Sequence, residues 1–260
     1  MSTSLENPFE MANEKLRTKW REYRRAGNLS KLMEEEKPLD LWPVQYPTPD
    51  PKKRKNYVLF IGINPSARPS SIPTVKIRGD EDISADNAIR IIDFEENERG
   101  EETNNPTFFS PLQHIADGID ASMIDIDVFA LRMTSSNNVR ELMSQTKYSD
   151  YFKDQFIIFN ELLENVLKLM PPKGIVMNNA TASRLLFGEY GEMPGVGIKR
   201  IRLLPSRAGE LNNRGCHEIV REHGSKRIPL FLSGFIPQGH MDTFAIERLR
   251  WHLRTVIQPK

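Results

Sequence analysis

Four short apolar segments, each followed by a helical pattern, constrain the fold of this chain more than any other feature. They are residues 57–61, 124–131, 174–177 and 228–232. The first of them is a continuous apolar run, which is typical of a strand buried on both faces. Strands that alternate with helices predict a parallel sheet with helices on both faces. We therefore expect an α/β fold in which ligands bind at the carboxyl ends of the strands.

Helical spacing of apolar residues predicts the helices that accompany these strands. The predicted helices span residues 11–26, 108–119, 149–170 and 180–187, with a last helix after residue 242. Asp242 is expected to cap the last helix, and Asn178–Asn179 the helix before it. Residues 199–204 and 218–221 are expected to pair as a minor hairpin.

The chain divides into an N-terminal extension and one larger domain. Residues 1–56 are interpreted as a helix followed by a proline-rich connector that wraps the core, and residues 57–260 as the α/β domain. Within that domain, residues 67–107 are acidic and lack periodicity. This segment is much longer than an ordinary loop, so we interpret it as an insertion.

The formal net charge of +1 conceals an uneven distribution. Residues 78–127 contain 3 basic and 14 acidic side chains, whereas residues 191–260 contain 12 basic and 6 acidic ones. A basic C-terminal quarter is suited to contact with phosphates. An unevenly charged, solvated surface explains the same pattern equally well.

Several kinds of site are excluded or disfavoured. A single cysteine, Cys216, rules out a disulfide within the chain and a four-cysteine metal site. Grouping it with His217 and His223 as a zinc site is disfavoured, and so is a magnesium site at Asp125 and Asp127. The phosphate-binding, dinucleotide-binding, zinc-protease and serine-hydrolase motifs are missing. We expect no metal and no cofactor.

Membrane insertion and secretion are also disfavoured. No apolar run approaches the roughly 20 residues that span a bilayer. The first residues lack the basic and apolar pattern of a secretory signal. We expect a soluble, cytoplasmic protein whose oligomeric state is open.

The first apolar strand leads into a turn with a distinctive sequence. Residues 58–66 read Val-Leu-Phe-Ile-Gly-Ile-Asn-Pro-Ser. An asparagine at such a turn can orient a water molecule through its side-chain oxygen while backbone amides face a ligand. A turn that only ends the strand is the alternative.

This segment closely resembles the first motif of the uracil-DNA glycosylase superfamily, and most of all its mismatch-specific branch. Residues 107–118, 174–186 and 232–242 resemble later segments of that branch, so the resemblance covers residues 57–257. Residues 127–134 also resemble a less characterised branch with an Asn-Pro-Ser turn.

The resemblance implies a fold and an activity. The implied fold is a three-layer α/β/α sandwich around a four-stranded parallel sheet. The implied activity is removal of uracil, or a related damaged or mismatched base, from DNA. Such an enzyme flips the nucleotide into a pocket, where water cleaves the bond between base and sugar.

The resemblance also implies roles for particular residues. Asn64 would position the water. His240 would either replace the polar group of the family's second motif or be a partly exposed capping residue. Phe109, or its neighbour Phe108, would stack on the flipped base. Arg132 lies where some branches carry a base-reading asparagine, and it would either hold a phosphate or a base or be a surface cation. Phe235, Ile236 or Met241 would wedge into the gap in the DNA. The remaining implied contacts to base, sugar or DNA backbone are Gly62, Ile63, Pro65, Ser66, Ser233 and Gly234.

The second motif departs from the family pattern and keeps two other functions open. Residues 233–240 read Ser-Gly-Phe-Ile-Pro-Gln-Gly-His where the family has His-Pro-Ser or Asn-Pro-Ser. One alternative is a non-catalytic protein that binds a nucleotide or nucleic acid on the same fold. The other is a hydrolase of free nucleosides or nucleotides.

Overall fold

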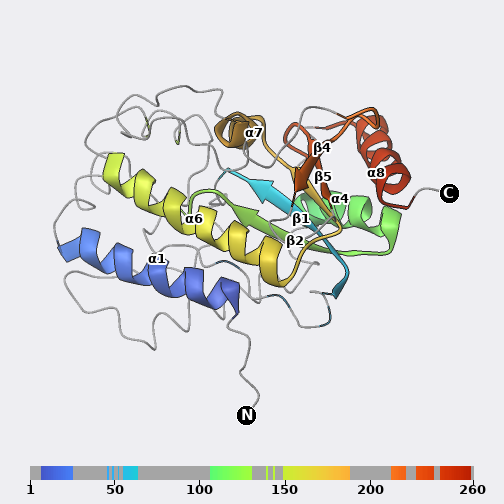
Figure 1. Cartoon of the computed structure of the whole chain (residues 1–260). Coiled ribbons are helices and arrows are strands. Elements are labelled where there is room, and N and C mark those ends of the chain that lie inside the picture. Colours follow the sequence, from blue (N-terminus) through green and yellow to red (C-terminus); the bar gives the residue numbers. More distant parts are fainter. Residues whose placement is uncertain are drawn as a thin grey trace, which may run out of the picture.

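A mixed five-stranded sheet forms the centre of the molecule (Figure 1). The computed structural model describes residues 7–25, 46, 49, 52, 55–63, 106–130, 139, 143, 149–187, 212–220, 227–236 and 241–258. The strands are β1 (Tyr57–Gly62), β2 (Ser122–Asp127), β3 (Gly174–Met177), β4 (His217–Val220) and β5 (Arg227–Leu232). Their order in the sheet is β2-β1-β3-β5-β4.

The four predicted strands are all present and run parallel, but the sheet is not purely parallel. β4 pairs antiparallel with β5, with His217 opposite Leu230. The expected four-stranded parallel sheet is therefore corrected to a five-stranded mixed sheet. Six residues separate β4 from β5 in the chain, and so short a connection suits antiparallel neighbours, whereas parallel neighbours need a crossover. Residues 199–204, the expected partner of this segment, lie outside the described part of the chain.

Helices cover both faces of the sheet (Figure 1). One face is packed by α1 (Pro8–Arg25), α6 (Ser149–Leu169) and α7 (Ala180–Phe187), and the other by α4 (Pro106–Ala116) and α8 (Thr243–Ile257). A 3₁₀ turn, η2 (Asp117–Ile119), continues α4. No helix in the described ranges is long and apolar enough to cross a membrane.

Alternation along β1 divides the core between the two faces. Tyr57, Leu59 and Ile61 face the cluster that contains α1 and α6, whereas Val58 and Phe60 face the cluster that contains α4 and α8. These five side chains are at most 1% exposed. The apolar run is therefore a strand buried on both faces, as predicted.

The predicted N-terminal helix is an integral part of one face. Figure 1 shows α1 lying beside α6. Its residues Phe9 and Leu16 belong to the same core cluster as the sheet. Asn13 exchanges two hydrogen bonds with the backbone of Tyr46: its amide nitrogen donates to the carbonyl at 2.9 Å, and its oxygen accepts from the amide at 2.7 Å. These contacts attach part of the proline-rich connector to α1.

The second strand ends earlier than the predicted range of 124–131. β2 stops at Asp127 because its partner β1 stops at Gly62, its register partner. The next residues turn away while their amides remain bonded. The Val128 amide donates to the Gly62 carbonyl at 3.1 Å, and the Ala130 amide donates to the Gln155 side chain at 2.8 Å.

Candidate functional site

The carboxyl ends of four parallel strands meet at one edge of the sheet, which we call the carboxyl edge. Backbone hydrogen bonds connect neighbouring strand ends. The Asn178 amide donates to the Ile61 carbonyl at 2.8 Å, and the Ser233 amide donates to the Met177 carbonyl at 3.0 Å. The ends of β1, β3 and β5 are therefore held in fixed relation to one another.

The connections make the space between β1 and β3 a topological switch point. The next described helix after β1 is α4, on one face of the sheet, whereas the helix after β3 is α7, on the other face. Because the chain leaves these neighbouring strands toward opposite faces, a crevice is expected between their carboxyl ends. Residues 62–63 of the first motif end β1 at this place.

The structure describes five of the ten predicted site residues. Gly62, Ile63, Phe109, Ser233 and Gly234 are described. Asn64, Pro65, Ser66, Arg132 and His240 lie outside the described residues, as does the side chain of Phe108. Gly62 ends β1, and Ile63, Ser233 and Gly234 follow strand ends at the same carboxyl edge.

The glycine at position 62 has a steric explanation. A Cβ built on Gly62 would lie 2.2 Å from Oδ1 of Asp127 and 3.3 Å from its Cγ. The Asp127 carboxylate therefore occupies the space that a side chain at position 62 would need. No local sequence pattern places Asp127 beside the first motif; the β1–β2 register, which pairs Gly62 with Asp127, does so.

A buried phenol lies within the electrostatic influence of the same carboxylate. The Tyr46 side chain is 4% exposed, and its hydroxyl has no hydrogen-bond partner among the described residues. Burial, followed by the negative charge of Asp127, raises the pKa of Tyr46. The tyrosine therefore stays neutral at physiological pH.

Ile63 presents its backbone rather than its side chain at this edge. Its side chain is buried in the core cluster, and its carbonyl accepts a hydrogen bond from the Phe129 amide at 3.0 Å. Phe109 is half-buried in α4. Because α4 leads back from the carboxyl edge toward the start of β2, the N-terminal part of this helix belongs to the same end of the molecule.

The segment after β5 corrects one expectation. Ile236, one of the three predicted wedge residues, is completely buried, and its amide donates to Oδ1 of Asn178 at 3.0 Å. A side chain held in the core cannot enter DNA. Phe235 and Met241 are half-buried, whereas Gly234 is exposed, with no atom of the described residues within 4 Å of a built Cβ.

The two asparagines after β3 have separate roles. Asn179 caps α7 as predicted, because its Oδ1 accepts from the amides of Thr181 at 2.8 Å and Ala182 at 3.2 Å. Asn178 instead bonds the segment after β5, and its side chain is 4% exposed. This bond joins residues 58 positions apart in the chain, so no local sequence signal could reveal it.

The described residues support neither of the two metal sites that the sequence disfavoured, the magnesium site and the zinc site. Asp125 and Asp127 lie on the same side of β2 and are both half-buried. Within the described residues, no three His, Cys, Asp or Glu side chains are grouped closely enough to hold a metal ion. His223 lies outside those residues.

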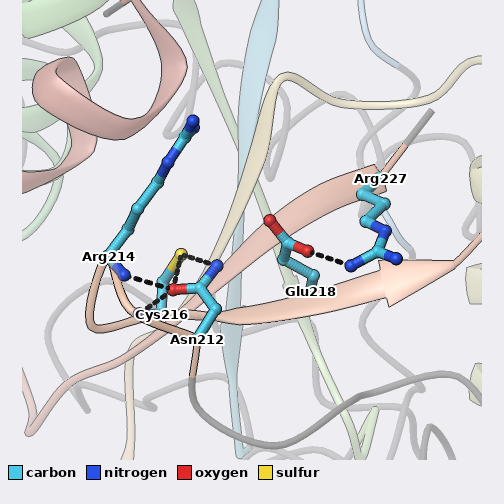
Figure 2. A network of polar contacts seen from close by, with 5 residues as sticks. All are labelled: Asn212, Arg214, Cys216, Glu218 and Arg227. Carbon is cyan, nitrogen blue, oxygen red and sulfur yellow. Dashed lines mark hydrogen bonds and ion pairs between the residues drawn. The ribbon is translucent and has the colours of Figure 1, made fainter.

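A cavity of about 1140 Å³ lies at the opposite, amino edge of the sheet. Its lining includes Lys55, Lys173 and Arg214 beside apolar residues from the ends of α6 and α8. Glu218 and Arg227, on neighbouring strands, form an ion pair of 2.8 Å at the same cavity (Figure 2). Arg227 lowers the pKa of Glu218 through this hydrogen bond. None of the five predicted site residues that the structure describes lines this cavity.

Cys216 is a core residue held by its own turn. It is 1% exposed, and its amide donates to Oδ1 of Asn212 at 3.2 Å (Figure 2). Burial raises the pKa of the Cys216 thiol. Both observations favour an unreactive thiol over a nucleophile or a metal ligand.

Cys216 is therefore expected to react with DTNB at least about tenfold more slowly in the folded chain than in guanidinium at about pH 8, because burial limits both access and thiolate formation. The rate should keep rising with pH above the ordinary thiol range. The absorbance of the released thiolate measures both effects. Equal rates in the folded and the unfolded chain would show that the thiol is accessible.

Comparison with protein families and with characterised proteins gives no match to this chain.

Proposed function

We propose that this protein is an N-glycosidase that removes uracil, or a related damaged or mismatched base, from DNA, in the manner of the uracil-DNA glycosylase superfamily. One observation carries the proposal. The first motif ends β1 at the switch point between β1 and β3, where an α/β sheet of this connectivity binds ligands. Asn64 follows directly in the chain.

The other segments that resemble the superfamily support the same location. The ends of β3 and β5 are bonded to each other and to β1 at the carboxyl edge. Phe109 belongs to the first turns of α4, the helix that follows the first motif in the described chain. Segments more than 100 residues apart therefore converge on one edge.

The acidic stretch 78–127 would weaken DNA binding if it lay beside the DNA, and the positions of two of its residues reduce this effect. Asp117 and Asp120 belong to the acidic stretch 78–127, but they lie between α4 and the start of β2, at the amino end of the sheet. Asp120 lines the cavity there. These two charges lie at the opposite end of the sheet from the proposed DNA-binding edge. At that distance they repel DNA phosphates least.

The chemistry suits a site with few ionisable groups. The bond between base and sugar breaks through an oxocarbenium-like state, so placing the water and stabilising the departing base contribute more than a strong base does. In this proposal Asn64 orients the water, His240 contributes the second polar group and Phe109 stacks on the base. Asp127 lies against Gly62 and adds negative charge near the developing cation.

Labelled oligonucleotides containing uracil opposite adenine, uracil opposite guanine, or hypoxanthine test the proposal. The wild type should produce abasic sites, seen as alkali-cleaved product, from at least one of them. Asn64→Ala should lower the single-turnover rate by about 100-fold, because a mispositioned water reacts poorly. Asn213→Ala, which truncates an exposed asparagine near the amino edge, is the matched control and should retain the wild-type rate.

Two results would contradict the proposal. One is an absence of abasic product from all three substrates with the wild type. The other is an equal rate for Asn64→Ala and Asn213→Ala. Release of a free base from nucleosides but not from oligonucleotides would favour the nucleoside hydrolase.

A further inference from the structure

The outward face of α8 exposes two large aromatic side chains. Phe244 is 84% exposed and Trp251 is 65% exposed, the highest values among the large hydrophobic residues described. They are seven residues apart, so they lie on one face of the helix. The opposite face, with Leu253 and Val256, is buried against the sheet. The aromatic pair is therefore separate from the buried residues that anchor the helix.

Arginines accompany these aromatics. Arg248 is exposed and lies four residues after Phe244 and three before Trp251, so it shares their face. Arg254 is exposed one turn further along. Neither side chain has an ion-pair partner in the described residues, whereas the nearby Glu247 is paired with His114 and Arg250. The outer face of α8 thus carries a stripe that combines two aromatic rings with two arginines that have no ion-pair partner among the described residues.

The position of α8 connects this stripe to the candidate site. The helix begins after Met241, whose sulfur lies 4.0 Å from the Ser233 hydroxyl at the carboxyl edge. Its last turn reaches the amino-edge cavity through Val256 and Ile257. Figure 1 shows α8 on the outside of the molecule, next to α4. Phe244 is thus the member of the stripe nearest to the candidate site.

We propose that the outer stripe of α8, made of Phe244, Arg248, Trp251 and Arg254, binds a single strand of nucleic acid beside the candidate site. Bases stack on the two aromatic rings, and the arginines contact phosphates. The placement beside a flipped nucleotide rests on the proposed function, but strand binding itself does not.

The spacing of the stripe suits such a strand. Seven residues of helix advance about 10.5 Å. A nucleic acid strand carries a phosphate about every 3.4 Å along the helix axis of a duplex, so the two rings are about three nucleotides apart. Interleaved arginines favour a polyanion over an apolar protein surface as the occupant of this face.

Fluorescence anisotropy with a labelled 15-nucleotide oligothymidine, which contains no uracil, tests the stripe. Phe244→Ala and Trp251→Ala should each weaken binding about tenfold, as expected for loss of one stacked base. Arg248→Gln and Arg254→Gln should each lower the magnitude of the slope of log affinity against log salt concentration by about one, the amount expected for one lost phosphate contact. Ile157→Ala, which removes an exposed aliphatic side chain from α6 on the other face, is the matched control and should bind like the wild type.

Failure of this inference and failure of the proposed function are distinguishable. If the wild type makes no abasic product but the stripe variants lose oligothymidine binding, the stripe stands and the glycosidase proposal falls. If the aromatic variants bind like Ile157→Ala, the stripe inference is wrong whatever the enzyme activity. It is also wrong if Trp251→Ala abolishes self-association or vesicle binding while oligothymidine binding is unchanged. Thermal melts of every variant confirm that the exposed substitutions leave the fold intact.

Discussion

Replacing Gly62 with alanine is expected to lower the free energy of unfolding by about 1 kcal/mol, the low end of the range for overpacking, because the obstructing oxygen ends a side chain that can shift. The added methyl group would lie 2.2 Å from Oδ1 of Asp127, well inside contact distance. Relief requires the carboxylate to rotate or the two strand ends to separate. Backbone strain is not the cause, because Gly215 is the one described glycine with a positive φ.

A double-mutant cycle with Asp127→Ala identifies the cause. Once the carboxylate is removed, the nearest described atom to the new methyl group is the Ile126 carbonyl oxygen at 4.0 Å, an ordinary contact. In that background Gly62→Ala should be neutral or stabilising by up to about 1 kcal/mol, since alanine restricts the unfolded chain more than glycine does. Urea titrations of the four proteins measure the coupling. An equal cost in both backgrounds would show that Asp127 is not the obstacle.

Replacing Asn178 with alanine is expected to cost about 2 kcal/mol of unfolding free energy, because the Ile236 amide loses its acceptor while remaining buried. The loss of stability should be concentrated at the carboxyl edge of the sheet. The segment after β5 would lose a side-chain bond to β3, so hydrogen exchange at the Ile236 amide should accelerate. Chemical denaturation and amide exchange by NMR give the two measurements.

The neighbouring asparagine provides a matched control. Asn179→Ala removes the cap of α7, which typically costs about 1 kcal/mol, but leaves the bond to Ile236 in place. In Asn179→Ala, amide hydrogen exchange should accelerate in the first turn of α7 and not at Ile236. Acceleration at Ile236 in both variants would mean that the end of β3 unfolds as a unit and that Asn178 has no special role.

Local patterns were sufficient to predict most of the elements. The helix from Ala180 to Phe187 and the strand from Gly174 to Met177 have the predicted bounds. Asp242 caps α8 as expected, with its Oδ1 accepting from the Ala245 amide at 2.7 Å. These features depend on side-chain periodicity and on bonds between residues close in the chain, and both can be read directly from a sequence.

Features that depend on distant pairing were not predictable in the same way. The position of β4 beside β5, and not in a separate hairpin, depends on which edge of the sheet is unpaired. The burial of Ile236 depends on Asn178, far away in the sequence. The exposed stripe on α8 was not predicted, because apolar spacing identifies the inner face with Leu249 and Leu253 but does not show which other apolar side chains stay exposed.

The candidate site was predictable in its location but not in its contacts. The first motif indicated the end of a buried strand, and Gly62 and Ile63 do end β1. The reason for glycine at position 62 became evident only from the register of β1 against β2, which brings Asp127 alongside. The roles of Asn64 and His240 remain predictions, for which the oligonucleotide experiment is the test.

The order of the strands also affects how copies of this protein meet one another. β2 and β4 are the two edge strands of the described sheet. Exposed edge strands tend to pair with the edge strand of another molecule. β2 carries Asp125 and Asp127, and Glu218 of β4 is tied to Arg227 of β5. Pairing of β2 with the β2 strand of a second copy would bring these aspartates close together. Repulsion between their carboxylates therefore opposes a continuous intermolecular sheet at the β2 edge.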